Sequence, residues 1–193
     1  MMEAGATMLL ELDGETGAPL TFELGRGRTY QLLFRNRARF EGALGRISRS
    51  GGVGTVMHDG GLISNLSIRE NLLLPVAYRD PDMLDEASRR AGEVLAAIGL
   101  AAADIDALLR RLPAGLSALE RRISGFVRAL LANPQVMAFD RLADDLTPEE
   151  SHHAETLHRV WWSCFPFRTA IYLDYEGRAR LACQQPDVCY HVT

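Results

Sequence analysis

Short apolar segments separated by helical patterns constrain the fold of this chain more than any other feature of its sequence. Thr29–Phe34 reads TYQLLF, Val136–Phe139 reads VMAF and Thr169–Leu173 reads TAIYL. Runs of this length that are rich in β-branched, aromatic and aliphatic residues are typical of buried strands. Further strand candidates are Met8–Leu12, Leu20–Leu24 and Val53–Met57.

Helical patterns stand between several of these segments. Pro81 can occupy a first helical turn, and apolar residues then recur at spacings of three and four until Gly99. Ser117 can cap a second helix, which stops before Asn133-Pro134 because proline restricts the residue ahead of it. Residues 147–150 (Thr-Pro-Glu-Glu) form a strong start for a third helix. This alternation predicts an α/β fold with a mostly parallel core sheet and antiparallel strands at its start.

The composition is that of a globular protein. A chain of 193 residues suits one domain, and its 47% hydrophobic and 24% charged residues exclude a wholly disordered chain. The net charge of −4 argues against non-specific binding to nucleic acid. The chain start lacks a signal-peptide pattern, and no run approaches the ~18 apolar residues of a membrane span. We therefore expect a cytoplasmic location without direct membrane insertion.

The cysteines indicate neither a disulfide framework nor a metal centre. Their odd number, three, fits a reduced, intracellular protein. Cys183, Cys189 and His191 could be imagined as metal ligands, but zinc sites usually space paired cysteines two to four residues apart. We expect no metal site.

Two segments carry a resemblance to a known family. Leu112–Leu146 reads LPAGLSALERRISGFVRALLANPQVMAFDRLADDL, and Val53–Val76 reads VGTVMHDGGLISNLSIRENLLLPV. The first resembles the stretch of ATP-binding cassette (ABC) ATPases from the signature motif through the second nucleotide motif. The second resembles the loop that joins the two lobes, and its NLSIRENLLLP portion is most similar to ATPases of bacterial mammalian-cell-entry-type lipid importers. The similarity covers most of residues 20–176.

The resemblance implies an architecture and partners. It implies the P-loop-NTPase-like fold of an ABC nucleotide-binding domain over 1–193, with a helical lobe at 75–132 and an irregular tail at 177–193. Such subunits pair as homo- or heterodimers and serve a transporter permease, so this chain is expected to lie at the inner membrane through a partner. Gly61–Pro75 is most like the segment that receives the permease. Its docking candidates, which could equally be core residues, are Leu62, Ile63, Leu66 and Ile68.

The phosphate-binding loop of the family is altered here. The motif Gly-x-x-x-x-Gly-Lys-Ser/Thr, whose glycines let backbone N–H groups wrap phosphates, falls on Phe34–Glu41. Phe34 and Arg39 replace the glycines, Phe40 the lysine, and Glu41 the metal-binding hydroxyl. The arginines could attract an anion, or form a solvated basic edge. The positions left to a nucleotide are vestigial: Arg35, Asn36, Arg37, Arg39, Phe40, Glu41, Ser117 and Asp140.

The catalytic positions are altered as well. His58 stands where the family has a glutamine, Arg141 where it has the water-activating glutamate, and Tyr175 where it has a histidine. Arginine cannot act as a general base. Ser117 is interpreted as a helix cap or a phosphate contact. The resemblance implies that the residue at Asp140 helps hold magnesium in active relatives, and here we expect Asp140 to pair with a neighbouring arginine or to cap a loop. The sequence therefore predicts no enzyme and no cofactor.

Three functions remain open at this point. The first is a non-catalytic ABC-type subunit that is a structural or regulatory partner of a transporter, with lipids as one possible cargo. The second is an ATP-binding ABC ATPase with unorthodox residues, for which ATP and Mg²⁺ would be the cofactors. The third is a soluble interaction module that retains only the fold.

Overall fold

A computed structural model describes residues 8–13, 19–177 and 186–192. The strands are β1 (Met8–Asp13), β2 (Pro19–Leu24), β3 (Thr29–Phe34), β4 (Val53–Val56), β5 (Val136–Asp140), β6 (Thr169–Tyr175) and β7 (Val188–Val192). The α-helices are α1 (Arg37–Arg49), α2 (Ile68–Arg79), α3 (Leu84–Ile98), α4 (Ala102–Arg110), α5 (Ala118–Leu131) and α6 (Pro148–Cys164). Two short 3-10 turns, Pro81–Met83 and Pro113–Gly115, complete the described elements.

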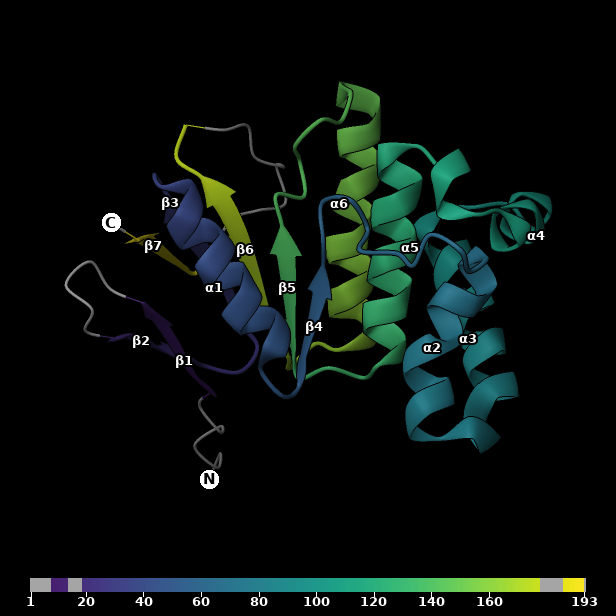
Figure 1. The fold of residues 1–193 in the computed structure, drawn as a ribbon, viewed down its shortest axis with the longest axis horizontal. Helices are drawn as coiled ribbons and strands as arrows, with labels where there is room; N and C mark the ends of the chain where they lie inside the picture. Colours follow the sequence, from purple (N-terminus) through teal and green to yellow (C-terminus); the bar gives the residue numbers. More distant parts are fainter. Residues whose placement is uncertain (1–7, 14–18, 178–185, 193) are drawn as a thin grey trace.

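A parallel sheet with the strand order β4-β5-β6-β3-β7 forms the centre of the molecule, and β1 and β2 pair separately as an antiparallel hairpin. In Figure 1 the arrows of β4, β5 and β6 point the same way, so their carboxyl ends meet at one edge. The predicted fold class is confirmed. Ligands of open α/β sheets bind at this edge, and the candidate site should lie there.

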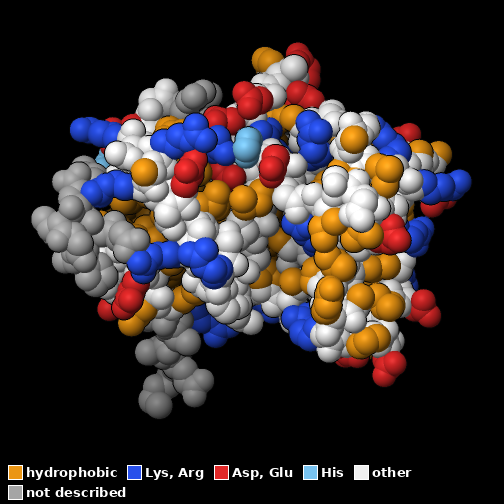
Figure 2. Space-filling view, in the orientation of Figure 1, with side chains coloured by type: hydrophobic (Ala, Val, Ile, Leu, Met, Phe, Trp, Pro, Cys, Tyr) orange, Lys and Arg blue, Asp and Glu red, His pale blue; other side chains and the backbone are white. Residues whose placement is uncertain are grey.

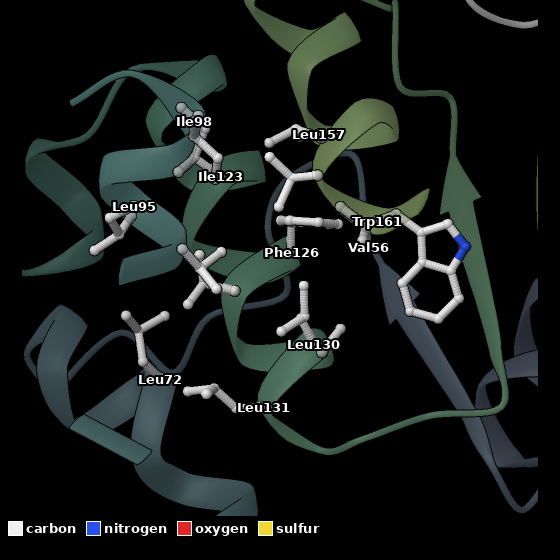
Figure 3. Close-up of a cluster of buried hydrophobic side chains, with 14 of the residues drawn as sticks. Val56, Leu72, Leu95, Ile98, Ile123, Phe126, Leu130, Leu131, Leu157 and Trp161 are labelled. Atoms are coloured by element: carbon white, nitrogen blue, oxygen red, sulfur yellow. The ribbon is translucent and has the colours of Figure 1, made fainter. Parts of the chain in front are cut away.

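Alternate residues of the central strands enter two hydrophobic cores. On β5, Val136 and Ala138 pack with α1 and the hairpin, while Met137 and Phe139 pack with α5 and α6. The period of two follows from the pleat, so one strand serves both layers. Figure 3 shows the larger core, in which Phe126 of α5 lies among side chains from several helices and β4.

Capping boxes fix the starts of three helices. The side chains of Ser67, Ser117 and Thr147 each accept from the backbone N–H three residues on, and the glutamate there accepts from the cap's own N–H. The predicted starts at 117 and 147 are therefore confirmed. The helix predicted to end near Gly99 is α3, and Gly99 caps its end in the left-handed conformation (φ 109°).

Two predicted boundaries are wrong. The helical part starts at Ile68, because Ser67 and Glu70 cap α2 there, so a lobe boundary at 75 would cut through that helix. The tail is not irregular throughout, since Val188–Val192 extends the sheet as β7 beside β3.

The prediction for the three cysteines lies partly outside the described residues, because Cys183 is not among them. Cys164 and Cys189 are exposed and free. Over the described ranges no group of three metal-ligating side chains occurs. None of the helices in these ranges is long and apolar enough to cross a membrane.

Candidate functional site

A cavity of about 900 Å³ opens at the carboxyl edge of the sheet. It lies where β3, β5 and β6 end and where the chain leaves β4. Its lining combines three aromatic rings with several charges of both signs: Phe34, Arg35, Arg37, Phe40, Glu41, Leu44, Met57, His58, Asp59, Asp140, Arg141, Tyr175 and Glu176. In Figure 2 the upper surface of the molecule, above this edge, likewise mixes blue and red side chains.

The loop between β3 and α1 is too short to wrap a phosphate. Only Arg35 and Asn36 separate the two elements. The Asn36 carboxamide oxygen caps α1 and accepts hydrogen bonds from the backbone N–H groups of Ala38 (2.8 Å) and Arg39 (3.4 Å). These are the orphan donors with which a helix start would otherwise bind an anion. In this structure Asn36 occupies these N–H groups, and the absence of a phosphate cradle stays a prediction.

Asp140, Arg141 and His58 form a connected cluster at the centre of the cavity. Asp140 is 1% exposed, and its Oδ1 accepts from Arg141 Nε at 2.8 Å. Its Oδ2 accepts from the backbone N–H of His58 at 3.1 Å. Arg141 Nη2 lies 2.8 Å from His58 Nδ1, so this nitrogen acts as the acceptor in that contact. Burial alone would lower the pKa of Arg141, but its hydrogen bond to Asp140 and the carboxylate charge outweigh burial and raise it.

Aromatic rings flank this cluster. The Phe40 ring stacks on Tyr175 with centroids 4.7 Å apart. The Arg141 guanidinium lies 5.2 Å from the Phe40 centroid and 6.0 Å from that of Tyr175. A cation over aromatic faces is stabilised by the ring quadrupole. Phe40 and Tyr175, which the sequence places in two distant motifs, therefore meet around one arginine.

Two ion pairs lie at the mouth of the cavity. Arg35 pairs with Glu176 at 2.5 Å, and Arg37 pairs with Glu41 at 2.7 Å. The arginine side chains are 72% and 83% exposed, so solvent screens both pairs and they contribute little to stability. Both guanidiniums can exchange their carboxylate for a phosphate at low cost, because the phosphate accepts bidentate hydrogen bonds in the same way.

The structure separates two predicted residues from this site. Arg39 lines a different cavity of about 190 Å³ together with Ala38 and Val192. Ser117 caps α5 and does not line the large cavity, and its Glu120 completes the capping box and pairs with Arg111. Of the two interpretations left open for Ser117, the helix cap is the one that the structure supports.

Replacing Ser117 by alanine should therefore cost only helix-cap energy. We expect the free energy of unfolding to fall by about 1 kcal/mol. Thermal melting of Ser117→Ala, compared with Ser64→Ala in the exposed inter-lobe segment, measures this loss. An unchanged melting temperature would contradict the capping role.

Sequence reasoning missed two charged residues of the cavity lining. Glu176 follows β6 directly and pairs with both Arg35 and His191, and these contacts lower its pKa, the His191 hydrogen bond most. Asp59 follows β4 by three residues, and its Oδ1 accepts from the backbone N–H of Gly61 at 2.9 Å. A charged residue just beyond a strand's carboxyl end was the available signal for both.

The cavity does not fit a nucleotide with its metal as the family would hold them. A divalent cation needs carboxylate oxygens, but both oxygens of Asp140 already accept hydrogen bonds and a guanidinium lies against one of them. The N–H groups at the α1 start are taken, and Glu41 adds a negative charge to the lining. Only Arg35 and Arg37, at the exposed mouth, remain suited to phosphate.

The docking candidates divide into core and surface residues. Ile68 is 0% exposed, so its assignment to a partner surface is wrong. Leu62 is half-buried and packs against the larger core, whereas Ile63 is 41% exposed. Tyr78 at the end of α2, which sequence reasoning missed, is 86% exposed. Figure 2 shows orange side chains gathered over the region that α2 occupies in Figure 1.

Two curated proteins are similar in sequence. No family model matches the chain. The lipoprotein-releasing system ATP-binding protein LolD 1 of Rhodopirellula baltica is 29% identical over 156 residues, which are 80% of this chain and 61% of that protein. The methionine import ATP-binding protein MetN 1 of Pseudomonas putida is 28% identical over 97 residues, 50% of this chain and 28% of that protein. The chain thus spans less than two thirds of either relative.

Two solved structures share the fold. CbiO1 from Clostridium perfringens, described as part of the ABC transporter complex cbiONQ, superposes with a TM-score of 0.65 at 14% identity, over 86% of this chain and 76% of that one. An ATP-binding subunit of an ABC transporter superposes with a TM-score of 0.64 at 20% identity, over 88% and 80%. At these identities the similarity establishes the fold.

These comparisons correct one prediction and leave another without support. The prediction that the chain is not an enzyme is contradicted, because both relatives in sequence are ATP-binding proteins of transport systems. The finer similarity to mammalian-cell-entry-type importers gains nothing from them, since neither relative is named as one. The chain has the ABC ATPase fold and is similar in sequence to two ATP-binding proteins of transport systems.

Proposed function

We propose that this chain is the ABC-type ATP-binding subunit of a membrane transporter. The observation that carries the proposal is the combination of one fold over 86–88% of the chain with sequence similarity to two transport ATP-binding proteins. The cavity lies at the carboxyl edge, where α/β sheets bind their ligands, and the groups in it that suit a phosphate are the exposed Arg35 and Arg37 at its mouth. A location at the cytoplasmic side of a membrane, through a permease, is part of the proposal.

The permease contact is proposed at the exposed apolar residues of the inter-lobe segment and α2. Ile63 and Tyr78 are the two large apolar side chains exposed there, and Leu62 and Leu66 lie half-buried beside Ile63. An apolar surface of this kind suits a short amphipathic helix of a partner. The relatives do not agree on a cargo, since one is named for lipoprotein release and the other for methionine import. A lipid cargo stays a prediction.

Co-purification of the tagged chain from detergent-solubilised membranes, with the retained proteins identified by mass spectrometry, tests the transporter role. We expect the detergent-solubilised permease to be retained by the tagged chain, and Ile63→Asp or Tyr78→Asp to reduce retention about tenfold or more, as at an interface hot spot. Phe167→Asp is the control, because that ring is 73% exposed but lies in the α6–β6 connection. All three variants should melt as the wild type does.

If Ile63→Asp and Tyr78→Asp both retain the permease as fully as the wild type does, the proposed docking surface is wrong. A wild-type chain that retains no permease would contradict the transporter role and favour a soluble interaction module that keeps only the fold.

Equilibrium binding of ATP tests the nucleotide role separately. If the chain binds ATP, the double variant Arg35→Gln/Arg37→Gln should weaken binding by roughly 100- to 10,000-fold, because it removes two charge-assisted hydrogen bonds of about 1.5–3 kcal/mol each. Arg46→Gln, in the last turn of α1, is the matched control. The expectation that no cofactor binds stays a prediction until this measurement, which would confirm it if wild-type protein shows no ATP binding.

A further inference from the structure

Each oxygen of the cavity's central carboxylate accepts a hydrogen bond from the chain itself. Asp140 ends a fully buried strand, and the two hydrogen bonds to its carboxylate come from Arg141 and from the backbone of the segment after β4. A buried carboxylate needs such partners, because an unpaired charge at 1% exposure is strongly unfavourable. Its charge is therefore balanced before any ligand arrives.

Arg141 has an unusual backbone conformation at the position directly after Asp140. Arg141 has φ 44°, in the left-handed region that non-glycine residues rarely adopt. Its N–H donates to Leu173 O at 2.9 Å, which ties this conformation to β6. Residues in such conformations persist only where the surroundings hold them, and they gather at functional sites.

The guanidinium makes contacts in three directions at once. It binds Asp140 through Nε and His58 through Nη2, and it lies over the stacked rings of Phe40 and Tyr175. A planar guanidinium with five N–H donors can bind a carboxylate and an imidazole and stack on aromatic rings at the same time. A divalent metal ion would need oxygen ligands in place of the rings. A divalent cation brought beside Asp140 would meet a permanent positive charge at contact distance.

We infer that Arg141 takes the place of a divalent cation at Asp140 and holds the segment Met57–Gly61 to the sheet without a ligand. This inference rests on the proposed function, because residues 57–61 lead directly from the cavity to the proposed permease surface. His58 receives contacts from both members of the pair, Asp140 at its N–H and Arg141 at its ring. Arg141 is then a positioning residue, and the segment stays attached whether or not a metal is present.

Mn²⁺ titration of the purified full chain, followed by the electron paramagnetic resonance signal of the free ion, tests this inference. Wild-type protein should bind Mn²⁺ no more tightly than Asp140→Asn does. Arg141→Asn removes the cation while suiting the left-handed backbone, and should bind Mn²⁺ about 10- to 100-fold more tightly. The double variant Asp140→Asn/Arg141→Asn should lose that gain, and Arg141→Lys should keep the wild-type behaviour.

Amide hydrogen exchange at His58 is a second test, because Arg141 should keep this amide protected without any metal ion. The His58 amide should be protected in wild-type protein without ligand, unchanged by Mg²⁺, and exchange faster in Arg141→Asn. The inference is overturned if wild-type protein binds Mn²⁺ in a way that Asp140→Asn abolishes, or if Arg141→Asn gains no affinity. Both measurements use the isolated chain, so a failed permease co-purification would reject the proposed function and leave this result standing.

Discussion

Replacing Gly125 by alanine should lower the melting temperature by about 2–12 °C, although alanine is the better helix former. Gly125 lies in α5, where its missing side chain lets Gly60 of the inter-lobe segment approach. A Cβ at Gly125 would lie 2.7 Å from Gly60 O and 3.2 Å from Gly60 Cα. Because these are backbone atoms, they cannot rotate away. Overpacking of this kind costs about 1–3 kcal/mol, which is about 2–4 °C per kcal/mol in a domain of this size.

Gly92→Ala is the matched control. Gly92 also lies within a helix, α3, but nothing stands within 4 Å of the position that its Cβ would take. Helix propensity alone should act there and raise the free energy of unfolding by up to about 1 kcal/mol. If both alanines stabilise the protein, the inter-lobe segment does not pack on α5 as this structure has it.

Replacing Arg122 by methionine is expected to raise the free energy of unfolding by about 1–4 kcal/mol, as when buried ionic groups give way to apolar side chains of similar length. Arg122 is 1% exposed, and its Nε and Nη1 have no hydrogen-bond partner among the groups described. Only Nη2 donates, to the carbonyl oxygen of Asp144. Burial lowers the pKa of Arg122, and the nearby charges of Asp145 and Asp144 offset part of that effect.

Arg121→Met, one residue along the same helix, is the control for Arg122→Met. Arg121 is only half-buried, so its replacement should change the free energy of unfolding by no more than about 0.5 kcal/mol. Urea unfolding of both variants gives the comparison. A large loss of stability in Arg122→Met would mean that the guanidinium is paired in solution, through water or a rearranged Asp144–Asp145 segment.

The sequence by itself determined the elements and the general location of the site. Buried strands such as Thr29–Phe34 and helix starts such as Ser117 follow from residues within one or two turns of each other, because side-chain period and capping are local properties. The sequence also placed Phe40, Asp140 and Tyr175 at positions where a ligand edge forms, and all three line one cavity.

Only the tertiary structure decided how those side chains pair. Arg141 and His58 stand 83 positions apart, and Arg35 and Glu176 stand 141 apart, so no local pattern could match them. No local pattern separates buried from exposed residues on α2 either, where Ile68 is a core residue and Tyr78 is exposed. Strand order and helix packing bring such residues together, and contacts across the sheet depend on the whole chain because each element's neighbours are set by all the others.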